Sequence, residues 1–229
     1  EGDNFVHTNY VYNYAGDKTF EKVFDDNGYL QNDYVYDDLR RNTLITSVAY
    51  YQGQNVGTNK TGYIYNDANN VTEKREYTSS TAYLTTNYEY NYKNMVTEVR
   101  EPIGDSNAQR TTRFVYDNKG NLTAKKLVLG GQELTSSYSY DGIGQLISET
   151  NALNQTKRYA YDTNGNKTKE VDARYAAQTI SAAPGLTYTY NRLSRLIEIS
   201  YYSGTAYSVL EKRTYDGRGN VIGVKLAGL

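Results

Sequence analysis

The residues most able to do chemistry are acids and amides that cluster where the chain should turn. The clearest case is the segment Asp162-Thr163-Asn164-Gly165-Asn166, in which several side-chain oxygens follow one another. Calcium prefers such oxygens, but a calcium loop needs ligands at alternate positions and a bidentate acid that closes the site. This segment offers one acid, at its start, and turn capping accounts for Asp162 fully. We therefore expect no metal site here.

Side chains for catalysis are scarce. The chain has one histidine, His7, and no cysteine, which excludes a histidine-based metal cluster, a Cys–His pair and disulfides. A Ser–His–Asp triad would depend on His7 alone. The many acids could include a glycosidase pair, but no pair stands out, and Glu73 and Glu98 fit solvent-facing strand positions. We expect a protein that is not an enzyme and uses no cofactor.

The acids and amides belong to a repeat. An aromatic residue, the anchor, is followed directly by Asp or Asn ten times, at Tyr12, Phe24, Tyr36, Tyr65, Tyr90, Tyr116, Tyr140, Tyr161, Tyr190 and Tyr215. In the best copies another aromatic stands two residues before the anchor, as in Phe114-Val115-Tyr116. This alternation places both rings on one face of a β-strand.

Each copy predicts a tight turn after its strand. The Asp or Asn can accept hydrogen bonds from backbone amides just ahead, and a residue of positive φ three positions later suits a type I turn followed by a G1 bulge. That later position holds Gly or Asn in eight of the ten copies. Arg40 and Ser194 are the exceptions, so we expect those two turns to be strained or differently built. The predicted turn residues are Asp37, Asp117, Gly120, Asp141, Gly144, Asp162, Gly165, Asp216 and Gly219.

Two positions after this Gly or Asn an apolar residue usually begins the returning strand. Lys18, Asn42 and Lys167 depart from that rule.

The spacing of the anchors predicts hairpins. From Tyr36 onward the anchors lie 21 to 29 residues apart, which accommodates two strands and two turns. The two longest periods have extra residues at 52–61 and 172–184, where we expect edge loops, the second with the only plausible helical turn. Before Tyr36 the spacing falls to 12, so Tyr12 and Phe24 mark either consecutive turns of one hairpin pair or a degenerate first repeat.

Tyrosine supplies much of the apolar area. The chain of 229 residues has 27 Tyr, 4 Phe and a net charge of -1, a composition that favours a thin sheet with two wet faces over a thick core. The near-neutral charge gives no electrostatic footprint for nucleic acid or an anionic membrane. We predict that the anchors align into a tyrosine ladder across neighbouring hairpins, in which cross-strand aromatic pairs contribute about 0.2–1 kcal/mol each. Its members are Tyr36, Tyr65, Tyr90, Tyr116, Tyr140, Tyr161, Tyr190 and Tyr215.

The pattern Tyr-x-Tyr-Asp-x-x-Gly-Asn/Arg-Leu resembles the YD-repeat, or Rhs-repeat, family over essentially the whole chain. The resemblance implies a strip of β-hairpins that winds into a hollow shell, as in bacterial Rhs toxins, the shell subunits of ABC toxin complexes and the teneurins. In the toxins the shell encloses a toxic C-terminal segment, whereas in teneurins it is part of an adhesive ectodomain. Residues 217–229 are still ordinary repeat, whereas Rhs toxins close with a self-cleaving core. Neither that cleavage nor a toxin activity is therefore assigned to this chain.

We expect residues 1–229 to form a single all-β array of repeated antiparallel hairpins, a spiralling single-layer sheet with about eight full repeats and a degenerate portion at 1–33. The array should be a fragment of a longer, secreted or cell-surface polypeptide. Its predicted function is structural: the wall of a shell, tube or fibre that encapsulates cargo or self-assembles.

The expected partners are further repeats of the same or neighbouring chains, in a homo-oligomer or filament, and an encapsulated polypeptide or surface glycan. Nucleic acid and membrane insertion are not expected. The alternative is an adhesive module that binds glycan or protein through tyrosine-rich surfaces.

Overall fold

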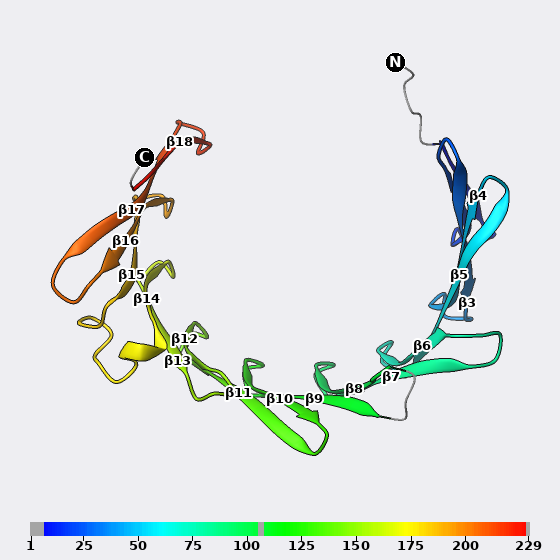
Figure 1. Ribbon diagram of the computed structural model, residues 1–229, viewed down its shortest axis with the longest axis horizontal. Helices are drawn as coiled ribbons and strands as arrows, with labels where there is room; N and C mark the ends of the chain where they lie inside the picture. The colour runs from blue at the N-terminus through cyan, green and yellow to red at the C-terminus, as the bar shows by residue number, and fades with distance from the viewer. Residues whose placement is uncertain (1–6, 105–107, 228–229) are drawn as a thin grey trace. The chain divides into compact units, whose positions relative to one another are not determined.

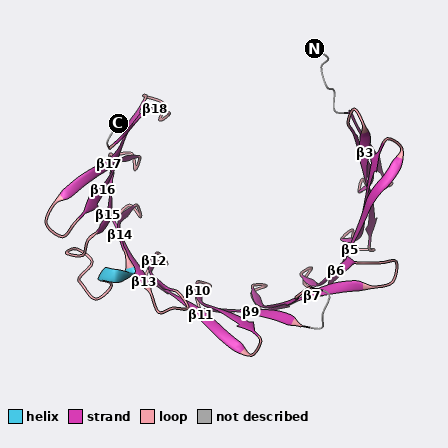
Figure 2. Cartoon of the chain, in the orientation of Figure 1, coloured by secondary structure: helices cyan, strands magenta, loops and turns pink. Residues whose placement is uncertain are grey.

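Most of the chain is β-strand in the computed structural model, which describes residues 7–104 and 108–227 (Figures 1 and 2). The described residues form eighteen strands of one sheet and a single 3-10 helix. Each strand runs antiparallel to the next one in sequence, for example β3 to β4 and β15 to β16. The predicted all-β fold of repeated antiparallel hairpins is therefore confirmed.

The chain divides into two compact units. The first runs to Arg113 and includes Val128–Gly131, and the second comprises Phe114–Leu127 and Gln132–Leu229. The first nine strands are β1 (His7–Tyr12), β2 (Lys18–Phe24), β3 (Gly28–Tyr36), β4 (Asn42–Tyr51), β5 (Gln54–Tyr65), β6 (Val71–Tyr77), β7 (Tyr83–Tyr90), β8 (Val96–Pro102) and β9 (Gln109–Tyr116). The others are β10 (Leu122–Leu129), β11 (Gln132–Tyr140), β12 (Leu146–Thr150), β13 (Thr156–Tyr161), β14 (Lys167–Val171), β15 (Gly185–Tyr190), β16 (Leu196–Tyr202), β17 (Tyr207–Tyr215) and β18 (Val221–Leu226). That both units form one array remains a prediction.

A thick hydrophobic core is absent from the described residues. Their buried hydrophobic side chains are Val171 and Ala183, while large apolar side chains such as Val35, Ile64 and Val115 are exposed. Cross-strand contacts and hydrogen bonds must therefore supply most of the stability, as the tyrosine-rich composition predicts.

The register shows a bulge at most of the anchors, although not at Phe24. In β11 and β12, Ser139 pairs with Ser148 but Tyr140 pairs with Leu146, so the register shifts between Ser139 and Tyr140. The same shift precedes Tyr36, Tyr65 and Tyr190. The extra residue lies in the returning strand, Ile147 in the β11–β12 hairpin, three residues after the glycine of positive φ, and such a bulge re-aims the neighbouring side chain.

The structure corrects one loop prediction and supports the other. Residues 52–61 are not an edge loop, because Tyr51 pairs with Gln54 across a tight turn and most of the extra residues lengthen β5. A register shift between Ala49 and Tyr50 accommodates one more residue, Val56. Residues 172–184 do leave the sheet, and they include the helix η1 (Ala173–Tyr175), whose first turn is capped by the Asp172 carboxylate.

The first two anchors mark consecutive turns. The β1–β2 hairpin turns after Tyr12, and β2 and β3 then pair as far as Phe24 and Tyr29. These two turns therefore lie at opposite ends of the strands, which decides between the two N-terminal alternatives.

Candidate functional site

The turn after each anchor is the most regular site in the molecule. In the turn at Asp117, one carboxylate oxygen, Oδ1, accepts the amides of Lys119 at 2.8 Å and Asn121 at 2.9 Å. The Gly120 amide donates to the Asp117 carbonyl at 3.1 Å, and φ at Gly120 is +95°. The carboxylate thus accepts hydrogen bonds from amides that have no strand partner where the backbone reverses.

The other predicted turn residues occupy the same positions. Oδ1 of each aspartate accepts the amides two and four residues ahead in the turns at Asp37, Asp141, Asp162 and Asp216. Gly144, Gly165 and Gly219 have φ of +90°, +84° and +93°.

These hydrogen bonds favour ionised aspartates. The Asn121 side chain and backbone lower the pKa of Asp117, and equivalent asparagines lower the pKa of Asp162 and Asp216. Because turn amides and a neighbouring asparagine occupy these carboxylates, they are poor candidates for catalysis or metal binding.

Arg40 and Ser194 adopt the glycine conformation, with φ of +63° and +56°. Of the two expectations for these turns, strain is therefore correct and a different build is not. An L-residue in this region costs about 1–2 kcal/mol.

The anchor tyrosines connect successive hairpins through their hydroxyls. Tyr90 Oη donates to the Val71 carbonyl at 2.7 Å, and Tyr140 Oη donates to the Leu122 carbonyl at 2.9 Å. Tyr36, Tyr65, Tyr161, Tyr190 and Tyr215 bond in the same way, at 2.7–2.9 Å, to Lys18, Asn42, Leu146, Lys167 and Leu196. Tyr116 is half-buried at the same position in β9.

The acceptor is always the first residue after the previous turn, and its position explains the need for a hydroxyl. Between β6 and β7 the paired residues end at Glu73 and Asn87, two residues after Val71. Between β14 and β15 they end at Lys169 and Thr187, two residues after Lys167. The strands separate beyond these pairs, and the tyrosine hydroxyl donates to a carbonyl that has lost its ladder partner.

These contacts differ from the ring-to-ring ladder expected from the sequence. Ring contacts in the described residues include Tyr29 with Tyr50 at 4.5 Å, Tyr77 with Tyr83 at 5.3 Å and Tyr202 with Tyr207 at 4.7 Å between centroids. None of the seven bonded anchors takes part in them. The rings of successive anchors are separated by the strand that carries the acceptor carbonyl.

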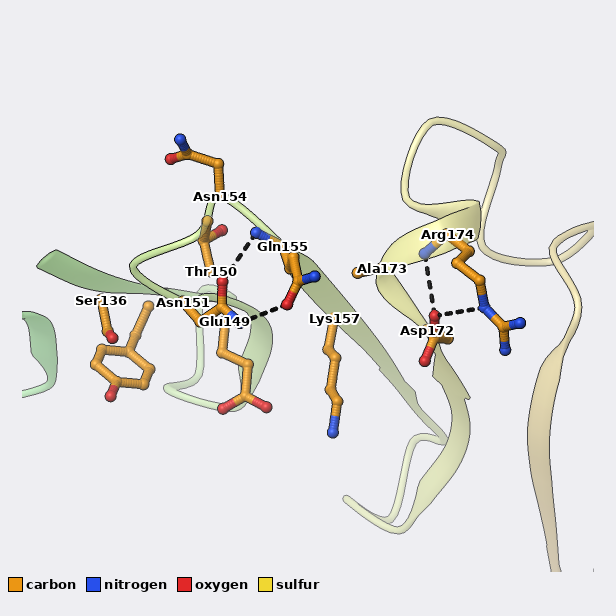
Figure 3. Close-up of a pocket in the computed structure, with 11 residues that line it drawn as sticks. Ser136, Glu149, Thr150, Asn151, Asn154, Gln155, Lys157, Asp172, Ala173 and Arg174 are labelled. Atoms are coloured by element: carbon orange, nitrogen blue, oxygen red, sulfur yellow. Dashed lines mark hydrogen bonds and ion pairs between the residues drawn. The ribbon is translucent and has the colours of Figure 1, made fainter. Parts of the chain in front are cut away.

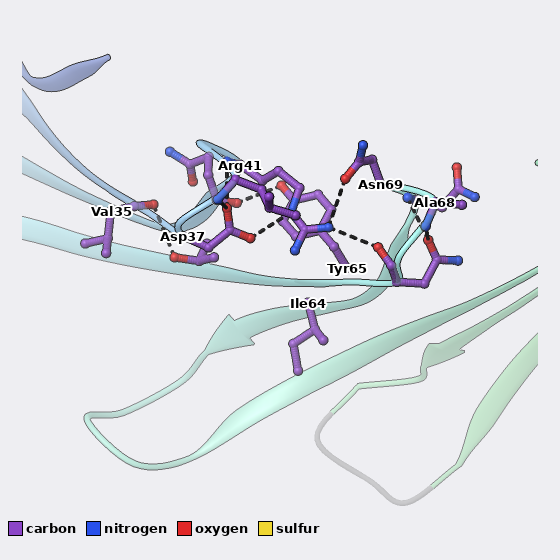
Figure 4. Close-up of polar contacts among 12 residues, drawn as sticks. Val35, Asp37, Arg41, Ile64, Tyr65, Ala68 and Asn69 are labelled. Atoms are coloured by element: carbon purple, nitrogen blue, oxygen red, sulfur yellow. Dashed lines mark hydrogen bonds and ion pairs between the residues drawn. The ribbon is translucent and has the colours of Figure 1, made fainter. Parts of the chain in front are cut away.

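Successive turns also contact one another through side chains. In the first unit Arg41 Nη1 donates to the Asn66 carbonyl and to Asn69 Oδ1, both at 3.0 Å, and the Arg41 guanidinium lies 4.8 Å from the Tyr65 ring centroid (Figure 4). In the second unit Asn166 Nδ2 donates to Ser194 Oγ at 3.1 Å. The residue after the left-handed position thus contacts the left-handed residue of the next turn.

Comparison with known proteins supports the assignment of these turns. The family model described as RHS Repeat matches residues 135–177. The resemblance to the YD-repeat, or Rhs-repeat, family is confirmed. No curated protein matches this chain.

A solved structure shares the fold of this chain. The crystal structure of TcdB2-TccC3-TEV superimposes on 96% of this chain with a TM-score of 0.67 and 17% sequence identity. The chain spans 11% of that protein's length. The crystal structure of TcdB2-TccC3-Cdc42 also matches, with 13% identity, over 96% of this chain and 18% of its own, at a TM-score of 0.26.

Two departures from the Rhs pattern have a common structural explanation. Lys167, in place of the usual apolar residue, lies 2.7 Å from Glu170 and 4.8 Å from the Tyr188 ring centroid. Lys18 repeats this arrangement, 3.1 Å from Glu21 and 4.8 Å from the Tyr34 ring centroid. A glutamate three residues later and a tyrosine ring of the next repeat therefore stabilise the charged end of each half-buried lysine.

One residue was misjudged from the sequence, and one expected turn, at Asn154-Gln155, has a form that the sequence did not predict. Glu98 is not solvent-facing: it is 8% exposed and accepts from Arg113 Nε at 2.6 Å, which lowers its pKa. The turn at Asn151 copies an Rhs turn at the opposite end of the strands, since its Oδ1 accepts the amides of Leu153 and Gln155 at 3.0 Å. Its Asn-x-x-Asn spacing was visible in the sequence, but Thr150 stands where an aromatic anchor would be.

In the described residues the one histidine has an aromatic neighbour, and the acids form no metal-binding group. His7 lies exposed in β1 with its ring 5.9 Å from that of Phe24. Within residues 7–104 and 108–227, no three His, Asp or Glu side chains are grouped to hold a metal ion. No helix in those residues is long and apolar enough to cross a membrane.

Proposed function

We propose that this chain is a structural, non-catalytic array of Rhs repeats, which forms part of the wall of a shell, tube or fibre in a secreted or cell-surface protein. The observation that carries the proposal is the series of anchor hydroxyls bonded to the preceding hairpin at 2.7–2.9 Å. This linkage depends only on neighbouring repeats. It can therefore be extended by adding hairpins, whereas a closed core would stop such growth.

Similarity to a much larger protein supports a role as one part of a wall. The chain matches 11% of the TcdB2-TccC3-TEV chain, so further repeats would supply the remainder. A wall made from this sheet would separate an enclosed polypeptide from solvent without needing an active site.

The strand edges are where such a wall would meet its neighbours. β18 pairs with β17 along one edge, and its side chains Val221, Ile222 and Val224 are 51%, 67% and 56% exposed. An exposed apolar edge strand is a template for another strand. We infer that further repeats, in the same or a neighbouring chain, pair with this edge.

Light scattering across a concentration series tests the self-association. We expect the chain to form larger particles as its concentration rises, and Val224→Glu to suppress them by placing a charge on the edge strand. Val115→Glu is the matched control, because Val115 is 44% exposed on a strand with neighbours on both sides. A compact monomer at every concentration, or equal suppression by both variants, would refute pairing through β18.

A further inference from the structure

A polar cavity of about 590 Å³ lies in the second unit, at the end of the strands opposite the Rhs turns. Its walls are β11, the β12–β13 hairpin with its turn at Asn151, and the start of η1 (Figure 3). Cavities of about 300–1,000 Å³ accommodate small ligands. Residues 172–184 create it, because this segment leaves the sheet and carries Asp172 and Arg174 beside β13.

Several groups on the walls have no partner in the described part of the chain. The side chains of Ser136, Tyr138 and Asn154 make no hydrogen bond there. Glu149 Oε1 accepts from Tyr159 Oη at 2.6 Å, which leaves Oε2 available. Lys157 Nζ lies 3.9 Å from its nearest carboxylate, that of Glu170. The cavity thus offers both donors and acceptors.

The charges on the walls cancel. Glu149 and Asp172 are acidic, Lys157 and Arg174 are basic, and the other lining residues are neutral. Glu149 and Lys157 pair across β12 and β13 and extend in the same direction in Figure 3. An anionic ligand would meet two carboxylates and a cationic ligand would meet two cations, so a neutral ligand is favoured.

We propose that this cavity binds a short neutral oligosaccharide. Sugar hydroxyls donate and accept hydrogen bonds together, which matches the mixed carboxylate, amide, hydroxyl and ammonium groups. Tyr138, opposite Glu149 in the register, supplies an aromatic ring beside them. An apolar ligand does not suit this cavity, because its lining lacks the hydrophobic side chains that dominate such sites. The proposal is independent of the wall function.

Calorimetry and amide NMR with a defined panel test the proposal. The panel contains neutral trisaccharides of glucose, mannose, galactose and N-acetylglucosamine, with trigalacturonate and chitosan trisaccharide as charged counterparts. We expect a neutral trisaccharide to bind and to shift the amides of residues 151–157 and 172–174. The charged counterparts should bind at least tenfold more weakly.

Two pairs of variants separate binding from folding. Tyr138→Ala and Asn154→Gly should each weaken binding about tenfold or more, and glycine keeps the turn because φ at Asn154 is +58°. The controls are Tyr88→Ala and Asn94→Gly, which remove the same side chains from the first unit and should leave binding unchanged. Absence of binding by every neutral trisaccharide at millimolar concentration, binding of a charged sugar alone, or equal loss in the control variants would overturn the proposal.

Discussion

Replacing the anchor Tyr90 by phenylalanine removes one hydroxyl and leaves the ring in place. The lost bond is the one from Tyr90 Oη to the Val71 carbonyl, 2.7 Å long. A hydrogen bond contributes about 0.5–1.5 kcal/mol net, and a carbonyl left buried without a partner costs about 1–3 kcal/mol. Tyr90 is half-buried, so water can reach the carbonyl in part and we expect a loss of about 1 kcal/mol.

Native-state hydrogen exchange is the appropriate assay, because repeat arrays open locally and exchange reports the stability of each turn separately. A loss of about 1 kcal/mol corresponds to roughly fivefold faster exchange. The effect should be confined to amides of the turns that follow Tyr65 and Tyr90. Tyr88→Phe is the control: it lies on the same strand and the same face, and its hydroxyl makes no hydrogen bond in the described part of the chain.

The result that would refute the reasoning is equal protection in Tyr90→Phe and in the wild type. Equal losses in Tyr90→Phe and Tyr88→Phe would also refute it, because they would assign the effect to hydroxyls in general and not to the bond with Val71.

Three further predictions concern strain, close packing and pH. Ser194→Gly should stabilise its turn by about 0.5 kcal/mol in urea unfolding, because glycine adopts positive φ without strain and this gain exceeds its entropy cost. A loss of stability would mean that the hydrogen bond from Asn166 to Ser194 contributes more than the strain costs. Gly185→Ala should be strongly destabilising, since its Cβ would lie 2.2 Å from the Glu170 carbonyl oxygen, whereas Gly217→Ala, with open space around it, should change little in the same unfolding assay. Stability should also fall as the pH rises above about 10, followed by circular dichroism. Burial raises the pKa of Tyr90 and Tyr140 in the folded state, so the stability present below the unfolded pKa is lost as the pH passes the folded pKa. A stability that stays constant through that range would contradict the buried, neutral hydroxyls.

The turns could be predicted from the sequence because their chemistry is local. Asp117 and Gly120 lie within one turn, so the carboxylate, the amides it accepts and the left-handed residue all appear in a few letters of sequence. The same locality made the strain at Arg40 predictable, and the repetition of the turn predicted an all-β chain of hairpins.

Only the tertiary structure decided which groups meet across hairpins. The Tyr90 hydroxyl meets a carbonyl 19 residues earlier, at a point that depends on where two strands separate. Glu98 is buried because the register brings Arg113 opposite it, and the cavity exists because η1 leaves the sheet beside the Asn151 turn. Register and strand separation are set by the sum of many weak cross-strand contacts, so no short segment of sequence contains them.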